Sequence, residues 1–147
     1  PPYPKPVLVT CCAVACGCFC YLFGGTFLDM LIATAIGAVE QLFLFACERK
    51  HVSRFLTNVF SSLVVAILSI LAFASGLPVH HDKIIIGDIM PLVPGIVFTT
   101  SIRDFYNGDY LSGTIHLIDA LLTALCIAVG ICLPIVLFRY LGGGLAL

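Results

Sequence analysis

Charged residues are scarce in this sequence. They make up 10% of its 147 residues, whereas 61% are apolar, and the mean hydropathy is +1.14. A soluble domain is about a quarter charged and about half apolar, so a chain of this length could not hide its apolar surface in a water-soluble core. The composition therefore predicts a polytopic membrane protein in contact with the lipid bilayer. The net charge of −1 gives no indication of nucleic-acid binding, and we expect none.

The sequence also lacks signals of processing and catalysis. It opens on Pro1-Pro2 without an initiator methionine, and no basic region of the secretory type precedes the first apolar stretch. We therefore expect a piece of a longer protein. There is no Gly-x-Ser-x-Gly or Ser–His pattern, and the adjacent His80 and His81 are expected in a loop, because neighbouring residues rarely aim at one metal. These absences predict a protein that is not an enzyme and holds no metal or cofactor.

Cysteine is abundant, but its placement does not fit a disulfide framework. Most of the eight cysteines lie in apolar stretches, and Cys12, Cys16 and Cys20 recur every four residues, so they share one face of a helix. We interpret them as small apolar residues that let helices approach closely. A metal or iron–sulfur site over residues 16–20 is the disfavoured alternative, since no histidine or carboxylate neighbours it.

Five stretches are long and apolar enough to cross a membrane, which takes about 20 residues. The sequence thus predicts an all-α helical bundle forming a single transmembrane domain over residues 1–147, with a polar connector over residues 101–112 and a Gly-rich tail from residue 139. The predicted spans are approximately residues 7–23, 27–47, 55–75, 84–100 and 115–138.

Five spans place the two ends of the chain on opposite sides of the membrane. More basic residues then fall on the side of the N-terminal end than on the other side, which carries only Lys83 and Arg139. The positive-inside rule places the N-terminal end in the cytoplasm, although a re-entrant fourth segment would reverse everything after it. The basic residues on the N-terminal side are Lys5, Arg49, Lys50, Arg54 and Arg103.

Three acidic residues interrupt the predicted spans: Glu40, Asp88 and Asp119. A charge near the bilayer centre costs about 2.5–3.5 kcal/mol on insertion scales, so each one is a hypothesis for a functional site. Low dielectric disfavours the charged form of a carboxylate, which lets it exchange protons near neutral pH. Asp88 and Asp119 are the first candidates for proton coupling and Glu40 is the third. His116 shares a helical stripe with Asp119, and the alternative is that such stripes only hold helices together.

The fourth span contains Pro91, Pro94 and Gly95, which predict a broken helix close to Asp88. Pro94 would free the carbonyl of Met90 and begin a new half-helix. The first N–H groups of that half-helix, with the positive end of its dipole, would then form a site for a carboxylate at membrane depth, and Gly95 would permit close approach. A kinked helix without a ligand is the alternative.

Three motifs resemble the threonine/serine exporter family, which includes two-subunit relatives linked to export of dicarboxylates such as succinate. They are the runs Gly87–Gly95 (GDIMPLVPG), Ser101–Asp104 (SIRD) and Gly108–Gly113 (GDYLSG), and Leu22-Phe23-Gly24-Gly25 fits the same pattern. The resemblance covers nearly the whole chain. Thr100 stands where the family favours Asn, and Asp119 where it more often has Glu, so the substrate stays open.

The resemblance implies the membrane half of a larger subunit, without the soluble region that usually precedes it. It implies a partner, namely a second transporter half (or small membrane subunit). The broken helix and the acids inside the spans together predict a small carboxylate substrate that moves outward, driven by protons. Arg103, Asp104 and Asp109 belong to the motifs, and the first two would form either a gate or a membrane-edge ion pair. The expected function is a proton-coupled secondary exporter in the bacterial inner membrane. A non-transporting scaffold or assembly subunit is the alternative.

Overall fold

The computed structural model describes residues 4–50, 53–76 and 78–141, and all regular elements within these ranges are α-helices. The Pro1-Pro2 start and most of the Gly-rich tail lie outside the described residues. The helices, in order, are α1 (Lys5–Leu22), α2 (Phe27–Arg49), α3 (Arg54–Ala74), α4 (His81–Ile89), α5 (Gly95–Tyr106) and α6 (Tyr110–Leu141).

Four of these helices, α1, α2, α3 and α6, are long and apolar enough to cross a membrane. The stretch from His81 to Leu92 and the helix from Gly95 to Tyr106 together form one more span, the fourth in chain order, which is bent by 54°. The prediction of an all-helical membrane bundle with a broken fourth span is therefore confirmed.

The predicted polar connector over residues 101–112 is largely helical. Helix α5 continues to Tyr106, and α6 already begins at Tyr110 after a turn in which Gly108 has a φ of 83°. The Asp109 side chain accepts a hydrogen bond from the Ser112 N–H at 3.2 Å and so satisfies a free donor in the first turn of α6. Helix α6 thus extends at both ends beyond the apolar stretch of residues 115–138.

Helix α1 packs closely against α2 and α4, and glycines make this possible. A Cβ atom built on Gly37 of α2 would lie 2.8 Å from Cβ of Cys16. One built on Gly87 of α4 would lie 2.8 Å from the backbone N of Cys20. Cys16 and Cys20 are both fully buried in these contacts. Cys16 and Cys20 are thus small packing residues, as the sequence predicted, whereas Cys12 is half-buried and Cys11 and Cys18 are exposed.

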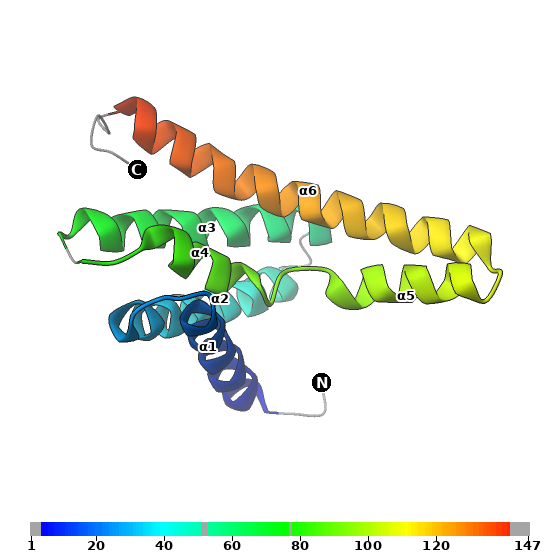
Figure 1. Cartoon of the computed structure of the whole chain (residues 1–147), viewed down its shortest axis with the longest axis horizontal. Coiled ribbons are helices and arrows are strands. Elements are labelled where there is room, and N and C mark those ends of the chain that lie inside the picture. Colours follow the sequence, from blue (N-terminus) through cyan, green and yellow to red (C-terminus); the bar gives the residue numbers. More distant parts are fainter. Residues whose placement is uncertain (1–3, 51–52, 77, 142–147) are drawn as a thin grey trace.

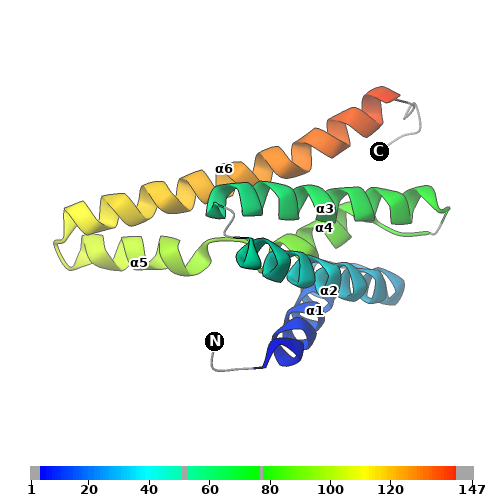
Figure 2. The ribbon, with the colours of Figure 1, turned by 180° about the vertical axis from the view of Figure 1, so that it is seen from behind.

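Helix α6 is the longest element, with 32 residues, and two other helices lie along it. Helix α3 packs on its C-terminal half and α5 on its N-terminal half (Figure 1). Figure 2 shows from behind that α5 and the start of α6 extend past the end of α2 and the beginning of α3. This hairpin is therefore not covered by the bundle of α1 to α4.

The close contact at Gly87 predicts that two glycine-to-alanine substitutions differ in their effect on stability. Gly87→Ala should lower the melting temperature of the detergent-solubilised protein, because overpacking of this kind typically costs about 1–3 kcal/mol. Gly95→Ala is the matched control, since a Cβ there meets no atom within 4 Å. Differential scanning calorimetry of the two solubilised variants would report both transitions. Equal melting temperatures for the two variants would contradict the packing described here.

Candidate functional site

The break between α4 and α5 is a short, tightly turned segment. Leu92 and Val93 both donate their N–H groups to the carbonyl of Ile89, at 2.8 and 3.2 Å. Pro91 lies within this turn and Pro94 follows it, and neither can donate an N–H to an ordinary helical ladder. Because the bend is 54°, the chain continues onward into α5 and does not turn back (Figure 1).

The groups that the sequence predicted to be free at this break are partly occupied. The N–H of Gly95 donates to the carbonyl of Val93 at 2.7 Å, and the carbonyl of Met90 accepts from the N–H of Val93 at 3.3 Å. Pro94 also accepts a hydrogen bond from Phe98. The turn thus replaces two of the expected ligand contacts with its own hydrogen bonds. Gly95 itself is exposed and open to close approach.

Two acidic side chains are buried in the interior of the bundle. Glu40 on α2 and Asp88 on α4 are both fully buried and lie within electrostatic reach of each other. The Cys16 thiol of α1 lies beside Asp88 and within electrostatic reach of Glu40. The site is therefore built by α1, α2 and α4, with Ser61 added from α3, and Asp88 lies only three residues before the first proline of the break.

The two acids have few partners. Ser61 on α3 donates its hydroxyl to Oε1 of Glu40 at a long 3.4 Å. Oε2 of Glu40 and both carboxylate oxygens of Asp88 accept no hydrogen bond from the described residues. No Lys or Arg in the described part of the chain forms an ion pair with either acid. A buried carboxylate without partners is costly unless it binds a proton or a cation.

The motif residues on α5 and α6 form a separate cluster. Asp104 accepts hydrogen bonds from the Ser112 hydroxyl at 3.1 Å and lies 2.8 Å from Nδ1 of His116. The exposed Arg103 makes no ion pair with Asp104 among the described residues. Neighbouring residues on a helix point in different directions, and for this reason the expected Arg103–Asp104 pair does not form. The Asp104 contacts instead tie α5 to α6.

Asp119 stands apart from both clusters. It is half-buried on α6, and no hydrogen bond or ion pair joins it to Asp88, Glu40 or His116 within the described ranges. Helix α6 packs on α3 and α5, whereas α2 packs on α4, so Glu40 and not Asp119 lies on a helix in contact with that of Asp88. Pro91 and Pro94 lie at the break itself, whereas Asp109 caps α6.

Sequence reasoning missed one buried acid, Asp29. It is fully buried at the start of α2, where it accepts a hydrogen bond from the Thr26 N–H at 2.8 Å. It also accepts from the backbone N–H of His80 at 3.0 Å and lies 3.2 Å from the His80 ring nitrogen. The spacing Thr26-x-x-Asp29 is a capping box and could have been found in the sequence. Unlike Glu40 and Asp88, this acid is fully satisfied and serves the fold.

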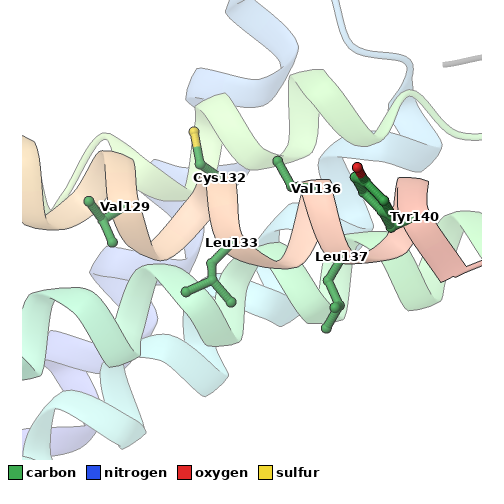
Figure 3. Close-up of a pocket in the computed structure, with 6 residues that line it drawn as sticks. All are labelled: Val129, Cys132, Leu133, Val136, Leu137 and Tyr140. Carbon is green, nitrogen blue, oxygen red and sulfur yellow. The ribbon is translucent and has the colours of Figure 1, made fainter.

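Two hollows on the surface differ in the polarity of their lining. One is an apolar hollow on the surface of α6, and this helix supplies all of its lining residues (Figure 3): Val129, Cys132, Leu133, Val136, Leu137 and Tyr140. The other, called the α1–α3 groove below, has a volume of about 660 Å³ and mixes polar with apolar side chains: Leu8, Gln41, Leu44, Phe45, Glu48, Arg54, Thr57 and Asn58.

The unsatisfied acids predict a stability gain when they are neutralised. Asp88→Asn and Glu40→Gln should raise the melting temperature in detergent, and the gain should grow from pH 5.5 to pH 8.5, because a buried carboxylate becomes harder to keep neutral as protons become scarce. Asp109→Asn, at the exposed end of α6, is the control and should give no such pH-dependent gain. A destabilisation by both neutral variants at high pH would show that the acids are paired.

Comparison with known proteins assigns the chain to a family. No curated protein and no solved structure matches it. A family model described as "ThrE: Putative threonine/serine exporter" matches residues 1–138, which is nearly the whole chain. The four membrane-length helices and the broken span formed by α4 and α5 agree with an integral membrane exporter. The chain belongs to the threonine/serine exporter family.

Proposed function

We propose that this chain is one half of a proton-coupled secondary exporter for small carboxylate-bearing metabolites. The family supports an exporter of threonine and serine, and a dicarboxylate such as succinate is the alternative cargo. The carrier would act without enzymatic chemistry. One observation supports proton coupling above all: three of the four carboxylate oxygens of Glu40 and Asp88 are buried without a hydrogen-bond partner in the described part of the chain.

In the proposed cycle, a proton binds at Glu40 and Asp88 when the site opens to the outside. Protonation removes the unpaired charge and allows the interior to close. Release of the proton to the cytoplasm restores the charge and with it the affinity for the next proton. Energy from the gradient enters at this exchange, which is the usual use of intramembrane acids in transporters.

The break gives this site a means of movement. Asp88 lies near the end of α4, and the turn from Met90 to Pro94 separates α4 from α5. Broken helices in transporters let one half shift without the other. A change in the bend of 54° would therefore move Asp88 relative to Glu40 on α2.

A second membrane half is the proposed protein partner. Helix α5 packs on α6 and leaves its other sides uncovered, with Ile96 86% exposed and Tyr106 92% exposed. Helix α6, at about 48 Å, is longer than the hydrocarbon core of about 30 Å. A projecting apolar hairpin is well suited to a protein partner. For the location we propose the bacterial inner membrane with the N-terminal end in the cytoplasm, as the basic residues indicate.

The coupling role predicts the effect of neutral substitutions on transport. In vesicles that carry the whole complex, Asp88→Asn and Glu40→Gln should lower gradient-driven threonine efflux by at least about tenfold and abolish its dependence on the pH difference, because the exchangeable proton is lost. Asp109→Asn is the control. Asp119→Asn tests the other acid that the sequence singled out. Full, pH-dependent efflux in the Asp88 and Glu40 variants would remove the coupling role from this pair.

The break predicts a separation between assembly and transport. Pro91→Ala and Pro94→Ala should allow a more continuous helix, so the complex should assemble in normal amounts but transport poorly. Quantitative co-purification of the partner half measures assembly, and efflux measures flux. A scaffold protein would give the reverse result, with altered abundance or association.

A further inference from the structure

The α1–α3 groove opens where α2 ends and α3 begins, and Figure 2 shows these two helix ends next to each other. Helix α1 contributes Leu8, and α2 and α3 contribute the rest of the lining. In the proposed orientation this opening faces the cytoplasm, from which an exporter takes its substrate.

Two opposite charges stand at the rim of this groove without neutralising each other. Glu48 on α2 and Arg54 on α3 are both exposed and line the same hollow, yet no ion pair joins them in the described ranges. The ammonium group of Lys5 lies 5.8 Å from the centre of the Phe45 ring, at the same end of the bundle. A carboxylate and a guanidinium held apart in one hollow are complementary to a molecule that carries both an ammonium and a carboxylate group.

The lining contains three uncharged polar residues beside the two rim charges. Gln41, Thr57 and Asn58 are half-buried, and their helices continue inward to Glu40 and Ser61, which are fully buried. Gln41 directly follows Glu40, and Ser61 lies about one turn beyond Asn58. The groove therefore lies on the same two helices as Glu40 and Ser61, although these two buried residues do not line it.

The side-chain amides of Gln41 and Asn58 are available for a ligand. Neither makes a hydrogen bond to any residue that the structure describes, although both line the groove. The Thr57 hydroxyl donates to the Ser53 carbonyl at 3.1 Å and can still accept. Together they offer donors and acceptors for a short hydroxylated side chain.

We propose that the α1–α3 groove is the cytoplasmic binding site for a zwitterionic α-amino acid. Arg54 binds the carboxylate, Glu48 binds the ammonium group, and Gln41 and Asn58 bind the side-chain hydroxyl of threonine or serine. This site rests on the proposed export function and deepens it, because Glu48 repels a dicarboxylate and thus favours an amino acid as cargo. From here the substrate proceeds along α2 and α3 toward Glu40.

The first measurement is the dependence of efflux on internal threonine concentration, with the whole complex in vesicles. Arg54→Gln and Glu48→Gln should each raise KM by about tenfold or more while the maximal rate stays within about twofold, as expected when a charge-assisted contact to the substrate is lost. Arg49→Gln is the matched control, because Arg49 is an exposed cation beside the groove but does not line it. Its KM should not change.

The second measurement assigns each charge to its ligand group by competition. L-Threoninamide lacks the carboxylate charge, and N-acetyl-L-threonine lacks the ammonium charge. In the unaltered complex, added unlabelled threonine should inhibit the efflux of labelled threonine more strongly than either analogue does. Arg54→Gln should lose the preference over the amide, and Glu48→Gln should lose the preference over the acetyl derivative. Loss of both preferences in each variant, or of neither, would overturn the assignment.

Failure of this site can be told apart from failure of the exporter function. Threonine efflux with an unchanged KM in both rim variants overturns the binding site and leaves the exporter function intact. If no efflux occurs, calorimetric titration of the purified complex with L-threonine decides, and binding that does not depend on Arg54 overturns the proposal. Loss of co-purifying phosphatidylethanolamine in the rim variants, with an unchanged KM, would identify the groove as a lipid site and also overturn it.

Discussion

The close contact of α1 with α2 and α4 is the constraint on which the rest of this structure depends. Gly37 and Gly87 remove the side chains that would hold these helices apart, and the buried Cys16 and Cys20 fill the narrow space between them. In a membrane, helices gain little from burying apolar groups, so close approach of backbones is a main source of association. This contact also closes the space around Asp88 and Glu40, and leaves most of their oxygens without partners.

The polar residues of the bundle fall into two kinds. At one end, Asp29 joins the start of α2 to His80 before α4, and at the other end Asp104 joins α5 to His116 of α6. These acids have their hydrogen bonds satisfied and tie helices together near the ends of spans. Glu40 and Asp88 are not satisfied in this way, and buried polar groups without partners call for an explanation, which the proposed proton exchange provides.

The sequence could predict features that belong to a single segment of the chain, but not those that depend on two helices. Glu40 and Asp88 could be recognised as candidates because an acid inside an apolar stretch needs a reason. The bend at Pro91 and Pro94 could be predicted because proline cannot complete a helix. By contrast, the pairing of His116 with Asp104 joins residues on two helices, and only the packing of α5 on α6 brings them together. The N–H of Gly95 looked free in the sequence, and the local turn at Val93 uses it.

The sequence by itself determined that the chain crosses a membrane as helices, where one span is broken and which acids lie at membrane depth, because these follow from local composition and from the chemistry of single residues. The tertiary structure decided which acid faces Asp88, which acids are satisfied, and that Glu48 and Arg54 share one groove. Those facts depend on the rotation and register of helices that are far apart in the chain. No local pattern fixes them, since they arise from the shapes of the facing helix surfaces.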